Sequence, residues 1–141
     1  MRPYELTKDD QVFIEKFMMF DIVEKKNFWS KFKSDDKELM HKAIKQHYIK
    51  EQQYKCAYCQ NEILVNHGMV WDIEHIISRD EEPDFTYEPE NLCVCCKDCN
   101  VNKSNKKITL KNLTKNLPKN ENEYAIPHPH FSKYCNHIFK S

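Results

Sequence analysis

Apolar residues in the first fifty positions recur at the spacing of helices. Thr7, with Asp10 three residues later, resembles a helix N-cap, so a helix is predicted to begin there. The stretch behind it is apolar over more than one face, with Val12, Phe13, Ile14, Phe17, Met18, Phe20 and Ile22. A second helix is predicted after Ser34, because the acidic residues that follow would favour the dipole of its first turn. We expect both helices to pack against the rest of the fold, and we assign no chemistry to His41 or His47.

From Tyr54 onward the pattern changes to short apolar runs separated by turn residues. Two strands are predicted at residues 62–65 and 69–74, around a tight turn that holds the only glycine, Gly68. A third short strand is predicted at 91–95, followed by a short exposed helix over 96–105. The pattern therefore predicts an α+β fold. We divide it into a helical extension (1–54), a central domain (55–107) and a lysine-rich C-terminal extension (108–141).

Composition narrows the class of protein. The chain has 141 residues, of which 40% are hydrophobic and 31% charged, which suits one domain with extensions and a modest core. No apolar run approaches the roughly 18 residues that a membrane-spanning helix needs, and the N-terminus lacks the apolar region of a signal peptide. We therefore expect a cytoplasmic protein without a membrane partner. The 22 basic and 22 acidic residues sum to zero, but that sum says nothing about their distribution.

The seven cysteines indicate metal binding rather than disulfides, because a reducing compartment disfavours disulfides. Four of them form two C-x2-C pairs separated by 36 residues, and each pair can present two thiolates to one tetrahedral ion. A structural zinc site, which would supply folding energy to a small core, is therefore predicted at Cys56, Cys59, Cys96 and Cys99. Cys95 could replace Cys96, but Cys93 and Cys95 face one way on a strand and fit better as core residues. Cys135, near His137, could be a second metal contact.

The residues between the cysteine pairs decide between a binding module and an enzyme. Glu74 directly precedes His75 at the end of an apolar run, which places an oxygen ligand and a general base together. Phosphodiester hydrolysis needs both. The ligand holds a divalent cation that stabilises charge developing on the phosphate, and a neutral imidazole takes a proton from the attacking water. Taken alone, such a pair is more often a salt-linked contact at a strand end.

Together these motifs resemble the HNH endonucleases of the ββα-metal group. The resemblance runs from Cys56 to about Lys107. It comprises the first cysteine pair, Asp72-Ile73-Glu74-His75-Ile76-Ile77, Asn91-Leu92, and the second cysteine pair followed by Asn100 and Lys103. It implies a small, treble-clef-like ββα core that is held by the zinc site and preceded by two or more helices.

The resemblance also implies a role for each motif residue. His75 matches the general base, and Glu74 matches the acidic ligand of a catalytic cation. Asn91 matches the central asparagine, which orients the histidine and braces the loop between the strands. Asn100 matches the third position, where many members have histidine, and would be the second ligand, with an oxygen that suits Mg²⁺ or Mn²⁺. The implied reaction uses one metal ion and in-line attack by water, and leaves 5′-phosphate and 3′-hydroxyl ends.

Three neighbouring residues leave alternatives open at this site. Asp72 lies two residues before Glu74 and points the same way on a strand, so it is either a further ligand or a support for one. Asn102 competes with Asn100 for the third position, although one turn of helix places Asn100 nearer the cysteine pair. Lys103 either contacts phosphate or is an ordinary surface lysine.

Charge is distributed in two blocks around these motifs. Between residues 72 and 90 eight acids stand against one base, and between 97 and 119 seven lysines stand against one acid. The lysine block is the predicted DNA-contacting surface, with Lys103, Lys106 and Lys107 as its first contacts. The alternative is a solvated polar tail. The acidic block is either solvated, a device against unprogrammed DNA binding, or a docking site for a basic partner.

Nothing in the sequence resembles a module that reads base sequence, so specificity would come from the flanks or from a partner. Small HNH proteins with helical extensions occur in restriction and in phage-defence systems such as the Septu type, where the nuclease works with an ATPase. The resemblance therefore implies a metal-dependent DNA endonuclease in phage defence or restriction, whose N-terminal helices could dock an ATPase or another subunit. The alternatives are a non-catalytic zinc module that binds nucleic acid or protein, and an accessory subunit.

Overall fold

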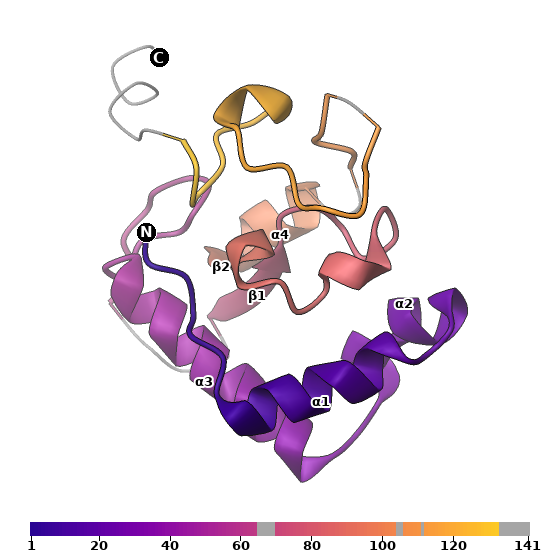
Figure 1. Cartoon of the computed structure of the whole chain (residues 1–141). Coiled ribbons are helices and arrows are strands. Elements are labelled where there is room, and N and C mark those ends of the chain that lie inside the picture. The colour runs from indigo at the N-terminus through magenta and orange to yellow at the C-terminus, as the bar shows by residue number, and fades with distance from the viewer. Residues whose placement is uncertain (65–69, 104–105, 111, 133–141) are drawn as a thin grey trace.

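The computed structural model describes residues 1–64, 70–103, 106–110 and 112–132. The main elements in chain order are α1 (Lys8–Met18), α2 (Ile22–Lys31), α3 (Asp35–Glu51), β1 (Trp71–His75), β2 (Leu92–Cys96) and α4 (Lys97–Lys103) (Figure 1). Short 3-10 helices lie at Pro83–Phe85, Pro89–Asn91 and Glu121–Glu123. The predicted α+β class and the order of two strands followed by a helix are therefore confirmed. Within the described ranges no helix is both long and apolar enough to cross a bilayer.

Capping side chains determine where the N-terminal helices begin. Thr7 Oγ1 accepts a hydrogen bond from the Asp10 N–H at 3.0 Å, and the Asp10 carboxylate accepts one from the Thr7 N–H at 3.1 Å. Ser34 caps α3 with its hydroxyl, so both predicted helix starts are confirmed. The apolar stretch expected to form one helix forms two, because the chain turns at residues 19–21 and the Asp21 carboxylate caps α2.

The sheet is an antiparallel pair in which His75 of β1 lies opposite Leu92 of β2. These strands lie close to the predicted strands at 69–74 and 91–95. Among the described residues the sheet has no third strand, so β1 keeps a free edge. That free edge is where the candidate site lies.

The strand predicted at 62–65 is wrong for the residues that the structure describes. Residues 62–64 contain only an isolated bridge, between Glu62 and Lys55. One bridge gives too few hydrogen bonds to extend the sheet. Val65 and the predicted turn at 66–68 lie outside the described residues.

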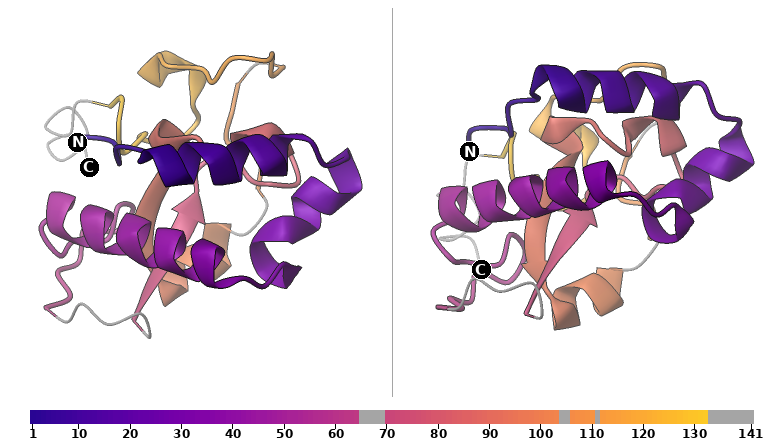
Figure 2. Two further views of the ribbon diagram at one scale, coloured as in Figure 1. Left: turned by 60° about the horizontal axis from the view of Figure 1, so that its bottom comes forward. Right: turned by 90° about the horizontal axis from the view of Figure 1, so that it is seen from below.

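The two faces of the sheet are covered by different parts of the chain. One face packs against the N-terminal helices in a core of Phe17, Phe28, Met40, Ile44, Tyr48, Ile49, Trp71, Tyr87, Leu92 and Val94. The other packs against the loop between the strands and the C-terminal segment, in a core of Ile76, Ile77, Phe85, Cys93, Ile108, Leu117 and Tyr124. Both views of Figure 2 show α3 in front of the strands, with α1 running alongside α3. The helical extension and the strands therefore share one hydrophobic core.

Candidate active site

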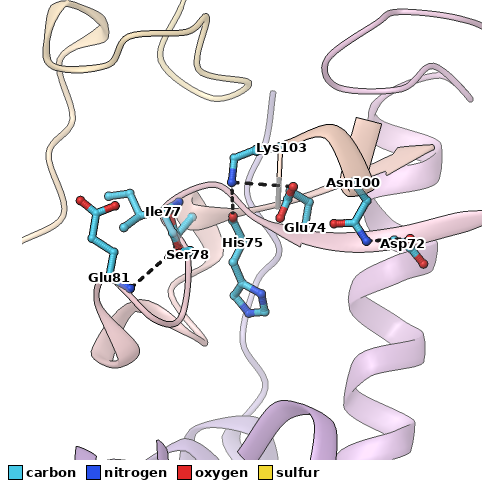
Figure 3. Close-up of polar contacts among 9 residues, drawn as sticks. Asp72, Glu74, His75, Ile77, Ser78, Glu81, Asn100 and Lys103 are labelled. Carbon is cyan, nitrogen blue, oxygen red and sulfur yellow. Dashed lines mark hydrogen bonds and ion pairs between the residues drawn. The ribbon is translucent and has the colours of Figure 1, made fainter. Parts of the chain in front are cut away.

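A cleft of about 1160 Å³ lies along the free edge of β1. One wall is formed by β1 and α4, and the other by α3 and the end of α2. Because alternate residues of a strand face opposite ways, His75 points towards α2 while Asp72 and Glu74 point towards α4 (Figure 3). At a free edge both sets can reach the same cleft. The structure thus brings Asp72, Glu74, His75 and Asn100 to one cavity.

His75 is buried and is oriented by the loop that joins the two strands. Its Nε2 lies 3.0 Å from the carbonyl oxygen of Thr86, which can only accept, so Nε2 carries the proton and the neutral ring keeps a lone pair on Nδ1. The ring also packs nearly at right angles against Trp29 of α2, with 4.4 Å between the centroids. Burial lowers the pKa of His75 well below its usual value and so favours the neutral ring. This imidazole has the tautomer and charge that a general base needs.

Asn91 is fully buried and ties together the loop between the strands. Its Oδ1 accepts a hydrogen bond from the Ile77 N–H at 2.8 Å, and its Nδ2 donates to the carbonyl oxygens of Ile77 at 3.1 Å and Phe85 at 3.2 Å. Phe85 directly precedes Thr86, whose carbonyl oxygen receives the His75 proton. Asn91 therefore acts on His75 through the loop, without a direct hydrogen bond to the imidazole among the described contacts.

Glu74 is buried beside Lys103 of α4. Glu74 Oε2 has no hydrogen-bond partner among the described residues, and the Lys103 ammonium is 3.8 Å from it. Burial is the main cause that raises the pKa of Glu74 to about 7. The Lys103 ammonium donates to the His75 carbonyl oxygen at 3.0 Å, and Lys103 is only 8% exposed. Lys103 thus supports the site from inside, which differs from the phosphate-contacting or surface positions expected for it.

Asp72 and Asn100 form the outer part of this wall. Asn100 Nδ2 donates to Asp72 Oδ2 at 2.9 Å, so the amide oxygen of Asn100 is left as an acceptor. The other Asp72 oxygen is paired with Lys97. Asp72 therefore supports Asn100 in this arrangement, which is one of the two alternatives for it. Asn102 is exposed and does not line the cleft, so the position of Asn100 is the better match for the third motif residue.

The two cysteine pairs meet in a cluster that could hold zinc. Zinc–sulfur bonds of about 2.3 Å in a tetrahedron place sulfurs about 3.8 Å apart, and Cys59 and Cys96 Sγ are 3.9 Å apart. Cys56 Sγ also accepts the N–H groups of Tyr58 and Cys96 at 3.4 Å each, which favours the thiolate form of a metal ligand. All four sulfurs, from Cys56, Cys59, Cys96 and Cys99, lie within 4.8 Å of one another.

The other cysteines have different surroundings. Cys93 and Cys95 are completely buried in β2, as the sequence predicted, and neither joins the cluster. Cys135 and His137 lie outside the described residues. Among the described histidines, cysteines and acids, no other group of three or more is close enough to bind one ion.

Sequence reasoning assigned no chemistry to the wall of the cleft that α2 and α3 form. His41 stacks on Trp29 with 3.8 Å between the centroids, and its Nε2 lies 2.8 Å from the Tyr87 hydroxyl. Burial is the main cause that lowers the pKa of His41 to about 3. Since Trp29 also contacts the ring of His75, these aromatic side chains form the support behind the candidate base.

Five cations line this cleft: Lys33, Lys37, Lys42, Lys45 and Arg79. The signal that could have indicated the wall is a spacing of four residues, since positions 37, 41 and 45 are basic or histidine and share one face of α3, and Lys33 precedes that helix at the same spacing. Lys37 is used internally, because its ammonium donates to the carbonyl oxygens of Trp29 and Phe32 at the end of α2.

The lysine block at 97–119 is less available than the sequence suggested. Lys97 pairs with Asp72, Lys103 is buried, and Lys119 pairs with Glu90 at 3.0 Å. Lys106 and Lys107 are exposed, but neither lines the cleft. The cations of the cleft therefore come mainly from the helical extension.

Residues 56–106 match the family model described as HNH endonuclease. This segment includes the four clustered cysteines and the residues Glu74, His75, Asn91 and Asn100. The predicted resemblance is thus confirmed for this part of the chain, and it supports a nuclease-type function with a nucleic-acid substrate. No curated protein and no solved structure matched the chain.

Proposed function

We propose that the chain is a metal-dependent endonuclease that hydrolyses phosphodiester bonds of DNA with His75 as the general base. The observation that carries this proposal is the hydrogen bond from His75 Nε2 to the Thr86 carbonyl oxygen. It leaves Nδ1 as the basic atom of a neutral ring that lines the cleft. A water in the cleft would give its proton to that nitrogen.

The residues beside His75 fit a divalent cation such as Mg²⁺ or Mn²⁺. Glu74 has a buried carboxylate oxygen without a hydrogen bond, which a cation would satisfy, and Asn100 offers an amide oxygen to the same cleft. When bound, the cation would supply charge stabilisation at the phosphate and the leaving oxygen. Asp72 would keep Asn100 in place, and Asn91 would hold the loop that positions His75.

Arg79 also lines the cleft, and its guanidinium would face the phosphate of the substrate. Its guanidinium is half-buried, and it makes no hydrogen bond or ion pair with the part of the chain that the structure describes. Burial has the largest effect on the pKa of His75, which it lowers, and of Glu74, which it raises; Arg79 is close enough to add a smaller lowering contribution to each pKa. A half-buried guanidinium that has no hydrogen bond or ion pair with the described residues is suited to a phosphate oxygen.

The test is a plasmid-nicking assay with Mg²⁺ or Mn²⁺, comparing wild type with His75→Ala and the control His47→Ala. His47 lies on α3 and bonds the Arg2 carbonyl oxygen, away from the cleft. Loss of the base should slow cleavage by about 10²- to 10⁴-fold, whereas the control should cleave like wild type. Equal rates for wild type and His75→Ala, or wild type without activity, would favour the non-catalytic zinc module instead.

The biological role proposed from the family resemblance is phage defence or restriction, with an ATPase as one candidate partner. The support for this role is the resemblance alone. Co-purification of the full chain with an ATPase from its native host would support it. Loss of plaque protection in a His75→Ala strain would connect that role to the cleft.

A further inference from the structure

The cleft has one wall inside the family match and one wall outside it. The wall of β1 and α4 belongs to residues 56–106, whereas α3 (Asp35–Glu51) precedes that segment. Helix α3 packs on both strands, so its position relative to His75 is set by the shared core. Any ligand that reaches His75 must therefore also meet the side chains of α3.

Two lysines of α3 face the cleft without a hydrogen-bond or ion-pair partner among the described residues. Lys42 is exposed and Lys45 is half-buried, and their spacing of three residues places them side by side on the helix. Within the described residues, neither ammonium makes a hydrogen bond or an ion pair. Lys37, earlier on the same helix, differs because its ammonium donates hydrogen bonds to two carbonyl oxygens.

Burial of the charged Lys45 ammonium costs free energy, and an anion bound in the cleft would offset that cost. Burial is the largest cause that lowers the pKa of Lys45, and Lys97 lowers it further, while only Asp72 opposes them. Asp72 is already paired with Lys97 and bonded to Asn100. A half-buried ammonium whose nearest acid is already engaged is expected where a bound anion completes the pairing.

We propose that Lys42 and Lys45 of α3 bind the phosphate backbone of the nucleic acid, so that the strand lies between the helical extension and the wall that carries His75. This inference rests on the proposed function, because it concerns the same cleft and the same class of substrate. On this inference the main phosphate contacts lie in the helical extension and not in the lysine block at 97–119, where the sequence predicted them. Lys106 and Lys107, exposed outside the cleft, then contribute only at long range.

The test measures binding of the full chain, with its zinc, to a short fluorescent DNA duplex and to the matching single strand. The catalytic cation is omitted, so that binding is read without cleavage. The variant is Lys42→Gln/Lys45→Gln, since glutamine keeps most of the stem and removes the charge. The control is Lys16→Gln/Lys50→Gln, which removes two exposed lysines of α1 and α3 that do not line the cleft.

Removal of one lysine–phosphate pair should reduce the slope of log affinity against log salt by about 0.9, which is about eightfold in affinity at 0.1 M salt. Lys42→Gln/Lys45→Gln should therefore weaken binding by about 10- to 60-fold and flatten the slope by about 1 to 2. The control should stay within about twofold of wild type. If the double variant fails to fold, Lys42→Glu at an exposed position should still weaken binding by at least the factor expected for one such pair.

If the cleft variant and the control variant weakened DNA binding equally, the inference would be overturned, because any surface lysine would then contribute as much to binding as Lys42 and Lys45. Unchanged binding in the cleft variant, or no binding of either DNA by wild type, would overturn it as well. A wild-type chain that binds through Lys42 and Lys45 but never nicks DNA would contradict the proposed function and leave this inference standing. Nicking of DNA that does not depend on Lys42 and Lys45 would support the proposed function and contradict this inference.

Discussion

Replacing Asn91 by alanine should destabilise the protein much more than the loss of one exposed hydrogen bond. The carboxamide makes three hydrogen bonds, at 2.8, 3.1 and 3.2 Å, with backbone groups of Ile77 and Phe85. Ile77 is 0% and Phe85 5% exposed, so water cannot readily replace the missing partner. At about 1 kcal/mol net for each bond, with an added cost for the buried N–H left unpaired, the free energy of unfolding should fall by about 3 to 4 kcal/mol.

Urea denaturation of the zinc-loaded protein, followed by tryptophan fluorescence, would measure this loss. The matched control is Asn27→Ala, which removes a single hydrogen bond from an exposed side chain to the Val23 carbonyl oxygen and should cost less than about 0.5 kcal/mol. Asn91→Asp tests the contribution of the Nδ2 donor separately, because it replaces that group by an oxygen. Its ionised oxygen would face two carbonyl oxygens, so it should be at least as destabilising as alanine at neutral pH.

A loss below about 1 kcal/mol in Asn91→Ala, with normal zinc content, would refute the conclusion that this carboxamide holds the loop. The consequence for catalysis follows from the same geometry. Because the loop carries the Thr86 carbonyl oxygen that fixes the His75 tautomer, Asn91→Ala should also lower the rate of cleavage under conditions where it remains folded. A folded variant with the wild-type rate would separate Asn91 from the orientation of His75.

Three further outcomes are expected. Metal analysis should find about one zinc per chain. The zinc should be lost, together with folding, in Cys59→Ser but retained in Cys95→Ala, because only Cys59 lies in the cluster. Loss of zinc from both variants would contradict this prediction. Lys37→Met should lower the free energy of unfolding by about 2 kcal/mol, because two carbonyl oxygens of α2 lose their donor; an unchanged urea midpoint would argue against it. His128 is buried, its Nδ1 accepts the His130 N–H, and its pKa is lowered from 6.5 to about 3 mainly by burial. The stability that it contributes is therefore present above pH 6.5 and lost as the pH falls, by about 1.4 kcal/mol between pH 7.5 and 5.5. His128→Asn should remove about that much of the pH dependence of urea stability, while the part due to the lowered pKa values of His41 and His75 remains.

The parts of the fold that the sequence predicted are those set by neighbouring residues. Thr7 and Ser34 begin helices through their own side chains. The two cysteines of each pair are only three residues apart, Cys56 and Cys59 at a turn and Cys96 and Cys99 where β2 passes into α4. The position of Glu74 directly before His75 is also local, and it places one carboxylate and one imidazole at the same strand end. Such features need no knowledge of the remaining chain.

The parts that could not be predicted depend on which segments meet in space. The burial of Lys103 arises because α4 folds back over β1 and brings its ammonium to the His75 carbonyl oxygen. The break at residues 19–21 was hidden because apolar residues continue on both sides of it, and only the Asp21 cap marks the new helix. The role of α3 as a wall of the cleft follows from a shared core, which no local pattern reports.

The shared core also means that the segment matching the HNH endonuclease model should not fold by itself. Six of the ten residues in the core on the helical side, Phe17, Phe28, Met40, Ile44, Tyr48 and Ile49, come from the extension. The side chain of Gln52 further pairs with both backbone groups of Val94, at 2.8 and 3.0 Å, along the outer edge of β2. A fragment that starts at Tyr54 would lose those hydrogen bonds and expose Trp71 and Leu92, which are now 0% and 1% exposed. Even with zinc bound by the two cysteine pairs, such a fragment should show no cooperative unfolding. A sharp urea transition in it would show that this segment folds without the extension.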